Sequence, residues 1–424
     1  MITEHEGPGA LVILANFVSP LAVDLGEESV LRQWAEQAPR KLWLTRPGDV
    51  LVSPVPLSLP FRRYVFHRLG IPEDAVTVVT VPDTPHLPMA QALAAHGMLR
   101  PLRALAGERP AARLLPTALD EASVALAADL RIPVVPYETN APDPGTLRVV
   151  AEMNTKSGFR AVARALGLRV PDGRACTGAE LGEVTGASLG AHGRVVVKPD
   201  RSAGGHGLVF VGPGDQPGQS PPPPDSRWVV EEHVDHRWAV SGQGHATATR
   251  VEVSYDGEMR VCAGSFAGYR SPLEAPPERA RAELADWTRA LGAHLAAEGY
   301  RGPYSLDLVC TRDGTLYALE RIVRRTATNT VHAMVRRLTG PGPRTPRWST
   351  GTVTAASPLS FDEAVRHLTE AGLDFQPGDA EGVLFFTDRP ADGRRWRYAA
   401  LAPSHSRLTE VEARLSAVLG HGPR

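Results

Sequence analysis

The sequence predicts a protein built from several α/β and α+β domains, and three observations carry this prediction. Its 424 residues are enough for about two to four domains of ordinary size. Through residues 1–150, short apolar runs alternate with helical stretches, which is typical of a parallel α/β sheet. From residue 151 onward, β-branched runs flank glycine-containing turns, which indicates antiparallel hairpins.

The first 150 residues contain the alternation in its clearest form. No G-x-G-x-x-G follows the first apolar run, so we expect no dinucleotide site there. The expected strands are Leu11–Leu14, Leu42–Leu44, Val76–Val81 and Val134–Val135, and the helices are Ser29–Gln37 and Met89–Leu105. These residues therefore predict an N-terminal α/β domain.

Composition limits the class of partner and the compartment. The net charge of −1 indicates no surface for nucleic acid. Cys176, Cys262 and Cys310 are too few and too widely spaced for a disulfide framework or a zinc site. The first residues carry acids where a secretory signal needs basic residues, and no apolar run is long enough to span a membrane. We therefore expect a cytoplasmic protein with no membrane partner.

A glycine-rich turn between two β-branched runs, Val195–Val211, is the strongest single motif. Backbone N–H groups in such a turn can hold phosphate oxygens, and a lysine that ends the first run adds a positive charge. The alternative is an ordinary hairpin with a flexible tip. The candidate phosphate-binding residues are Lys198, Ser202, Gly204, Gly205, His206 and Gly207.

Lysine is rare in this chain. Of the 46 basic residues, only Lys41, Lys156 and Lys198 are lysines. A lysine is a compact ammonium on a flexible stem and suits a single phosphate oxygen. We interpret Lys198 in this way and Lys41 as retained by chance.

A helix is predicted from Asn154 or Thr155, either of which can cap it, to Gly167. Lys156 then lies in the first turn, where the helix dipole disfavours a cation. A bound phosphate would compensate for that cost, and the alternative is a solvated side chain.

Two acidic residues end a later strand, Trp228 to Asp235. Backbone and carboxylate groups at a strand end can hold a polar heterocycle and a ribose, although acids in this position are usually solvated. The candidates are Glu231, Glu232, Val234 and Asp235.

Two further hairpins follow. Asp256-Gly257 predicts a turn between strands 249–253 and 259–263. Asp313-Gly314 predicts a second turn, in which Asp307 faces Glu320 and Cys310 faces Tyr317. Two opposed carboxylates repel unless a cation lies between them, so this pair predicts a Mg²⁺ site. A different register would leave one acid solvated.

Three arginines follow the second hairpin directly. Arg321, Arg324 and Arg325 can balance the two carboxylates or hold the oxygens of an acyl phosphate. In an extended segment Arg321 and Arg325 point away from the site, which selects Arg324.

A proline- and glycine-rich linker leads to a last α+β segment, residues 341–424. Two capping-box patterns, at Ser360 and Thr409, predict helix starts. The 383–387 and 395–400 stretches read as strands. We interpret this segment as a structural or substrate-covering cap.

The order of these motifs resembles the ATP-grasp superfamily over about residues 150–340. The resemblance implies an α/β domain over residues 1–150, an ATP-grasp fold of two α+β subdomains over residues 151–340, and the cap over residues 341–424. It also implies ATP and Mg²⁺ as cofactors. Lys156, Lys198 and the glycine loop would contact phosphates, the stretch Glu231–Asp235 would bind adenosine, and Asp307 with Glu320 would hold magnesium.

More narrowly, the chain is similar to the pheganomycin-type peptide ligases of natural-product biosynthesis, through the stretch NTKSGFRAV and the pattern ER-x2-R-x-T. This resemblance implies a ligase that activates an amino-acid-like carboxylate as an acyl phosphate. The acyl group then passes to an amine, as at the N-terminus of a peptide, to form an amide. Dimers are common among such relatives, so a homodimer is a further implication.

The chain departs from the superfamily pattern at two positions. Ile322 stands where a metal-binding Asn is usual, which leaves a second magnesium missing or held by water or Asn329. Ser305 stands where some relatives carry an arginine, which leaves Arg250 or Arg324 to balance transition-state charge. A catalytically weakened protein that binds nucleotide or a partner is the alternative function. A biotin-dependent carboxylase is disfavoured because no A-M-K-M-like carrier lysine is present.

Overall fold

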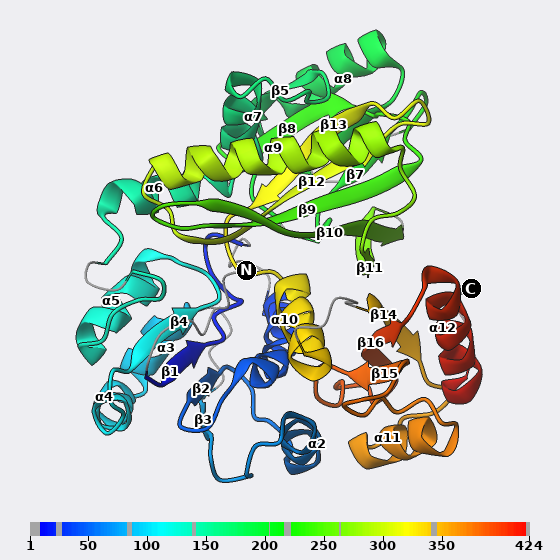
Figure 1. Ribbon diagram of the computed structural model, residues 1–424. Coiled ribbons are helices and arrows are strands. Elements are labelled where there is room, and N and C mark those ends of the chain that lie inside the picture. The colour runs from blue at the N-terminus through cyan, green and yellow to red at the C-terminus, as the bar shows by residue number, and fades with distance from the viewer. Residues whose placement is uncertain are drawn as a thin grey trace.

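The computed structural model describes residues 9–22, 28–82, 87–137, 141–202, 204–215, 222–262, 264–340 and 346–420. Figure 1 shows an N-terminal α/β unit below, two layers of antiparallel sheet above it, and a C-terminal unit beside it. No helix among the described residues is both long and apolar enough to cross a membrane.

The N-terminal unit contains a parallel sheet with the strand order β3-β2-β1-β4. β1 pairs in parallel with β2 and β4, and its four residues are fully buried, as expected for the centre of a covered sheet. The strands are β1 Leu11–Leu14, β2 Val50–Ser53, β3 Thr77–Thr80 and β4 Arg113–Pro116. The surrounding helices are α1 Glu28–Ala35, η1 Ala38–Leu44, α2 Leu59–Leu69, α3 Met89–Ala95, α4 Leu99–Gly107 and α5 Glu121–Leu130.

Three local predictions for this unit are wrong. The run Leu42–Leu44 belongs to the 3₁₀ helix η1, whose first residues include a proline that suits a helix start. The predicted helix Met89–Leu105 is broken at Gly97, which has a φ of +66° and separates α3 from α4. Val134 makes only an isolated bridge to Leu114.

A small antiparallel sheet follows, with the order β5-β8-β6-β7. It forms the upper part of Figure 1 together with α7 and α8. Its elements are α6 Pro144–Met153, α7 Lys156–Ala165, β5 Gly173–Thr177, α8 Leu181–His192, β6 Val195–Pro199, β7 Val209–Val211 and β8 Arg227–Glu232.

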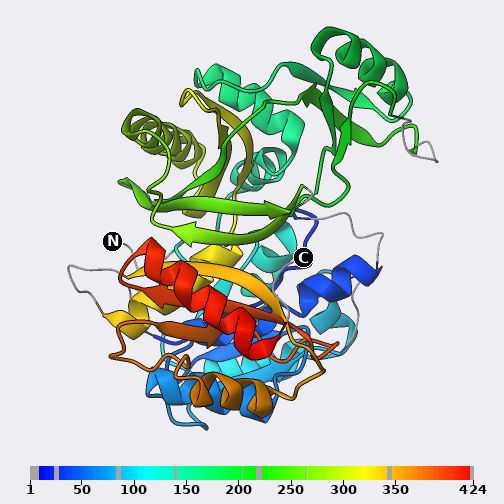
Figure 2. The same cartoon turned by 90° about the vertical axis from the view of Figure 1, so that its right-hand side faces the viewer.

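The large sheet has eight strands in the order β13-β12-β9-β10-β11-β14-β16-β15. Strands of the last segment therefore continue the sheet of the central part of the chain. α9 packs on one face of this sheet, and α10 lies between the other face and the N-terminal unit (Figures 1 and 2). The strands are β9 Trp238–Ala246, β10 Val251–Cys262, β11 Ser265–Ser271, β12 Gly302–Cys310, β13 Leu316–Ile322, β14 Arg347–Thr354, β15 Gly382–Phe385 and β16 Arg395–Ala402. The helices are α9 Glu278–Ala297, α10 Ala327–Thr339, α11 Phe361–Glu370 and α12 His405–Leu419.

The turn predicted at Asp256-Gly257 does not exist, because both residues lie inside the long strand β10. A Cβ atom on Gly257 would lie 2.4 Å from the Arg270 carbonyl oxygen and from the Tyr269 ring on β11. The Asp256 carboxylate accepts a hydrogen bond from the Leu273 N–H at 2.9 Å. Gly257 thus leaves room for the neighbouring strand β11, and Asp256 accepts a backbone hydrogen bond, so neither residue is there to form a turn.

Of the two predicted capping boxes, one is confirmed and the other is wrong. Ser360 caps α11 through a capping box with Glu363, as predicted. The box predicted at Thr409 is wrong, because α12 begins at His405 with Ser404 as its N-cap. Thr409 lies inside the helix, where its hydroxyl donates to the His405 carbonyl at 3.0 Å.

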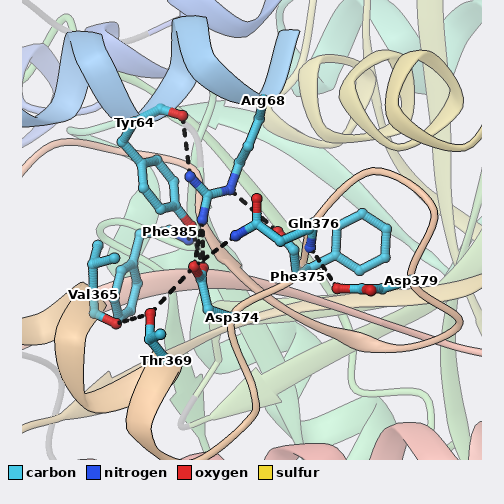
Figure 3. Close-up of polar contacts among 9 residues, drawn as sticks. All are labelled: Tyr64, Arg68, Val365, Thr369, Asp374, Phe375, Gln376, Asp379 and Phe385. Atoms are coloured by element: carbon cyan, nitrogen blue, oxygen red, sulfur yellow. Dashed lines mark hydrogen bonds and ion pairs between the residues drawn. The ribbon is translucent and has the colours of Figure 1, made fainter. Parts of the chain in front are cut away.

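The last segment also contacts the N-terminal unit through a buried ion pair, shown in Figure 3. Arg68 on α2 donates to both carboxylate oxygens of Asp374, at 2.5 and 2.7 Å, and to the Phe375 carbonyl at 3.2 Å. The two charged side chains are only 4% and 8% exposed. The guanidinium also stacks on the Tyr64 ring, 3.4 Å from its centroid. This pair connects residues about 300 positions apart in the sequence.

Arg68→Ala should lower the free energy of unfolding by about 3 kcal/mol, because it leaves the Asp374 carboxylate buried without its cation. Arg63→Ala is the matched control on the same helix, since Arg63 and its partner Glu73 are 60% and 56% exposed. It should cost less than about 1 kcal/mol. Urea denaturation measures both values, and equal costs for the two variants would contradict this account of the contact.

Candidate functional site

The glycine loop connects β6 and β7, which pair with Val195 opposite Val211. Gly204, Gly205 and Gly207 have positive φ angles of +64°, +83° and +71°. A Cβ atom on Gly205 would lie 2.2 Å from the Gly264 carbonyl oxygen, so the loop rests against the turn between β10 and β11. The structure therefore needs glycine here both for backbone conformation and for close approach.

Lys198, at the end of β6, lies in the core of the small sheet beside Glu231 on β8. The Lys198 ammonium forms an ion pair with one Glu231 carboxylate oxygen, and Arg160 of α7 donates to the other at 2.8 Å. All three residues are at most 5% exposed. Because both oxygens of Glu231 are bound by these cations, the backbone that follows β8 is a better candidate for contact with a base than this carboxylate.

The other three predicted adenosine-binding residues lie at the C-terminal end of β8 and directly after it. Glu232 accepts a hydrogen bond from the Asp172 N–H at 2.9 Å. The Val234 carbonyl lies 2.9 Å from Nδ1 of His236, and Asp235 is exposed. The structure thus places these three predicted residues next to one another at one edge of the small sheet.

Lys156 connects the glycine loop to the large sheet. Thr155 is the N-cap of α7, as one of the two predictions had it, and the Lys156 N–H donates to the Asp200 carbonyl at 2.8 Å. The Lys156 ammonium donates to the Ser202 hydroxyl at 2.9 Å and lies 3.4 Å from a Glu320 oxygen. Burial lowers the pKa of Lys156, while the charge of Glu320 raises it. One ammonium therefore bridges the loop and the predicted metal carboxylates.

Asp307 on β12 faces Glu320 on β13, as the sequence predicted. The details of the hairpin differ from the prediction, because the Gly314 N–H bonds to the Thr311 carbonyl and the Thr311 N–H bonds to the Thr315 carbonyl, which leaves a loop of three residues, 312–314. Cys310 consequently faces Leu316 rather than Tyr317. A register shift between Asp307 and Leu308 then restores the pairing of the two acids.

Asp307 is a carboxyl group in an unfavourable place for a negative charge. The Ser241 hydroxyl donates to Asp307 at 2.6 Å. Burial raises the pKa of Asp307 to about 7 against the effect of that hydrogen bond, and the charge of Glu320 also raises it. The paired carboxyl groups of Asp307 and Glu320 would fit Mg²⁺, because this ion takes one or two carboxylates and completes its shell with phosphate oxygens and water. Among the described residues, no group of three His, Cys, Asp or Glu side chains gathers to offer a richer metal site.

Arg324 lies beside the two acids. Burial lowers the pKa of Arg324 to about 10, while Glu320 and Asp307 raise it. Its Nε is buried with no hydrogen-bond partner in the described part of the chain. Arg321 donates to the Thr155 carbonyl at 2.6 Å, and Arg325 donates to the Pro116 carbonyl at 2.8 Å. Arg324 therefore lies against the acids, whereas its two neighbours are bonded to backbone carbonyls.

Arg250 lies apart from this cluster. It is in the turn between β9 and β10, where its side chain is 56% exposed and lies 3.8 Å from Glu252. The adjacent pair Val251–Ala246 is five residues along β9 from Ser241, which corresponds to about 17 Å at the usual rise of a strand. The structure does not bring Arg250 to the acids.

Sequence reasoning missed three residues of the site. Ser241 and Gln243 come from β9, where Gln243 donates to the Ser241 hydroxyl at 2.8 Å. Arg40 comes from η1 in the N-terminal unit, is 4% exposed, and has a buried Nε with no hydrogen-bond partner among the described residues. Burial lowers the pKa of Arg40 to about 9, and the charges of Arg397 and Arg324 lower it further. Two neighbouring buried arginines without a shared anion indicate a place for one.

Asn329 and Ile322 complete the surroundings of the acids. The Asn329 side chain forms the capping box of α10 with Thr326, and its amide donates to the Tyr255 hydroxyl at 3.0 Å. Ile322 pairs with Ser305 and offers no ligand. Asp307 and Glu320 therefore stay the candidate metal ligands, and Asn329 is bonded as a helix cap.

Comparisons with known proteins agree with this architecture. Residues 38–132 match the model of the pre ATP-grasp domain, and residues 363–415 match the PGM1 C-terminal domain. No curated protein matches the chain. The predicted fold class is confirmed: an N-terminal α/β domain precedes an ATP-grasp fold of two α+β subdomains and a C-terminal α+β segment.

Solved structures share this fold over nearly the whole chain. N5-carboxyaminoimidazole ribonucleotide synthetase from Thermus thermophilus is 14% identical over 98% of this chain and 99% of its own, with a TM-score of 0.58. Biotin carboxylase from Campylobacter jejuni, a β-γ-ATP complex, is 14% identical over 95% and 90%, with a TM-score of 0.59. N5-carboxyaminoimidazole synthase from Aspergillus clavatus, with ADP and 5-aminoimidazole ribonucleotide, is 11% identical over 96% and 97%, with a TM-score of 0.54.

Asp307→Asn should stabilise the magnesium-free protein more at pH 8 than at pH 5. Since the folded-state pKa of Asp307 is raised, the folded parent keeps a proton that the unfolded chain loses, and its stability falls as pH rises toward 7. The gain from the variant should therefore grow by about 2 kcal/mol between pH 5 and pH 8. Urea denaturation in EDTA measures this gain. A gain that is constant with pH would show that Asp307 is ionised throughout.

Proposed function

We propose that the protein is an ATP-dependent carboxylate–amine ligase, which activates a carboxylate as an acyl phosphate and transfers the acyl group to an amine. The observation that carries the proposal is the meeting of Asp307, Glu320, Lys156 and Arg324 at one place. Paired acids suit magnesium, and the flanking cations suit phosphate oxygens. This combination is what phosphoryl transfer requires, since its catalysis is mainly positioning and charge stabilisation.

ATP would lie between the small and the large sheet. We assign the phosphates to Lys156, Lys198 and the glycine loop with Ser202, Gly204, Gly205, His206 and Gly207. Adenosine would lie against Glu231, Glu232, Val234 and Asp235, with the backbone making the base contacts. The structural relatives solved with a β-γ-ATP ligand or with ADP support nucleotide binding by this fold.

Magnesium would be held by Asp307 and Glu320. The cation would supply charge neutralisation for the phosphate oxygens. Removal of the unfavourable interaction between two opposed carboxylates would make its binding favourable at neutral pH.

In the first step a carboxylate oxygen of the acid substrate attacks the γ-phosphorus of ATP. The bond to the β-γ bridging oxygen breaks, and ADP leaves. Arg324 from the large sheet and Arg40 from the N-terminal unit would hold the acyl phosphate between them. In the second step the amine nitrogen attacks the acyl carbon, the carbon–oxygen bond to phosphate breaks, and a proton leaves the nitrogen. Closure of the glycine loop would exclude water from the acyl phosphate.

The finer proposal follows the resemblance to the pheganomycin-type peptide ligases. The acid is then amino-acid-like, the amine is the N-terminus of a peptide, and the setting is natural-product biosynthesis in the cytoplasm, with a homodimer as the assembly. The motifs NTKSGFRAV and ER-x2-R-x-T support this proposal, since the first contains Lys156 and the second contains Glu320 and Arg324, three residues of the proposed site.

Magnesium-dependent ADP formation tests the proposal. ATP is supplied with panels of amino acids and short peptides, and coupled products are followed by mass. We expect ADP only when an acid and an amine are both present, with a product at the sum of the two masses less one water. ATP binding with no turnover across the panels would favour the alternative, a weakened protein that binds nucleotide or a partner, for which Ile322 is the supporting residue.

Lys198→Ala and Glu320→Ala should lower the rate of ADP formation by at least about 100-fold, since each removes charge stabilisation of the transferring group. Arg250→Ala is the matched control, because Arg250 is exposed and distant from the acids, and its rate should change less than about twofold. A parent-like rate in Lys198→Ala would refute the phosphate assignment.

A further inference from the structure

A cavity of about 280 Å³ lies between the face of the large sheet and α10. Tyr255 on β10, His332 on α10 and Trp348 on β14 form an aromatic wall, and Arg336 on α10 adds a positive charge. Neither the nucleotide site nor the acyl-phosphate site proposed above uses this cavity.

The aromatic wall is rigid. The rings of Tyr255 and His332 stack at 4.1 Å with an angle of 11°, and Trp348 lies 5.9 and 6.1 Å from them. The Tyr255 hydroxyl is held by Asn329 at 3.0 Å and by Thr328 at 3.1 Å. The wall is therefore formed before any ligand arrives, which lowers the entropic cost of binding.

Two polar side chains of the cavity, His332 and Arg336, have hydrogen-bonding groups without a partner among the described residues. Both ring nitrogens of His332 are buried, and neither has a hydrogen-bond partner within the described residues. Burial, with a smaller effect from the charge of Arg336, lowers the pKa of His332 to about 4. The ring is then neutral at pH 7, with one donor and one acceptor nitrogen. Arg336 is half-buried, and its guanidinium makes no hydrogen bond or ion pair with the residues that the structure describes.

A continuous chain of hydrogen bonds connects the cavity to the acids. It runs from Asp307 to Ser241 at 2.6 Å, to Gln243 at 2.8 Å, to Asn329 at 3.4 Å and to Tyr255 at 3.0 Å. Opposed residues on neighbouring antiparallel strands share one face, and the pairs Asp307–Ser241 and Gln243–Tyr255 are opposed. The cavity and the acids thus lie on the same face of the sheet.

The helix α10 sets the distance between them. Thr328, His332 and Arg336 recur every four residues, so they share one side of the helix. At 1.5 Å per residue, Arg336 lies about 12 Å along the axis from Thr328. An extended peptide covers about 3.3–3.6 Å per residue, so about three residues fit this span.

We propose that this cavity binds the carboxyl-terminal end of the amine substrate, a peptide of about three residues whose terminal carboxylate pairs with Arg336. The last peptide group lies against His332, which can accept from its N–H and donate to its C=O. The amino end then points along α10 toward Asp307 and Arg324. This inference rests on the proposed ligase function and names the class of its second substrate.

Peptide retention by the full-length protein tests the inference without any turnover. Two tripeptide libraries, one with free carboxyl ends and one amidated, are mixed with the protein, and retained peptides are identified by mass after rapid gel filtration. We expect retention from the free-carboxyl library alone. Arg336→Gln should reduce it about 10-fold or more, because a charge-assisted hydrogen bond is lost, and Arg336→Lys should restore part of it.

Arg366→Gln is the matched control, since Arg366 is an exposed arginine on α11 with a side chain 56% exposed. It should retain peptides as the parent does. Circular dichroism and the thermal midpoint confirm that Arg336→Gln is folded. Equal retention of amidated peptides, equal retention by Arg336→Gln, or no retention by the parent would each overturn the inference.

The retained peptides then separate this inference from the ligase proposal. With ATP and an acid, Arg336→Gln should raise KM for the peptide about 10-fold and leave kcat and KM for ATP unchanged. Retention as expected without ADP formation from any acid would refute the ligase and leave the peptide cavity. Ligation in which KM is insensitive to amidation and to Arg336→Gln would refute the cavity and leave the ligase.

Discussion

The pairing of Asp307 with Glu320 is the constraint on which the site depends. Two carboxylates opposed on neighbouring strands destabilise a sheet, and burial raises the pKa of Asp307 because no solvent offsets its charge. Two cations and one hydroxyl donor, from three different parts of the chain, offset the negative charge of this pair. Lys156 comes from the start of α7, Arg324 from the end of the hairpin, and Ser241 from the neighbouring strand. The acids thus determine which parts of the chain must meet.

The sequence predicted this pairing although it misplaced the turn. A loop of three residues, 312–314, in place of the predicted two shifts the expected register by one, and the irregularity beside Asp307 shifts it back. The residues that form a turn are adjacent in sequence and can be recognised there. A bulge depends on the neighbouring strand, so no short stretch of sequence predicts it. The alternation of strands and helices, the glycine loop and the Thr155 cap were predictable for the same reason, since each depends on residues close in sequence.

Features that depend on distant residues could not be read in this way. β9 is an interior strand of the large sheet, between β12 and β10, yet Gly242 and Gly244 deprive it of a β-branched pattern. Both glycines are explained by contacts: a Cβ atom at either position would lie within 2.3 Å of Thr288 or Tyr304. Arg40 was missed because its importance comes from Arg324, 284 positions later, and from burial in a junction that the sequence does not show.

The three lysines show how the junction is built. In a chain whose other 43 basic residues (46 less 3) are arginines, each lysine is at most 6% exposed. Lys156 donates to Ser202 beside the glycine loop, Lys198 pairs with Glu231, and Lys41 on η1 donates to Thr330 on α10 at 3.2 Å. Chance retention is therefore a poor explanation for Lys41, since its ammonium is buried and bonded between two parts of the fold. A single compact donor fits such a contact, whereas a guanidinium would bring five donors into a space with few acceptors.

Lys41 fixes α10 against the N-terminal unit, and α10 carries both the cap Asn329 and the cavity residue His332. In the proposed ligase, the placement of the amine substrate would therefore depend on a contact made from the N-terminal unit.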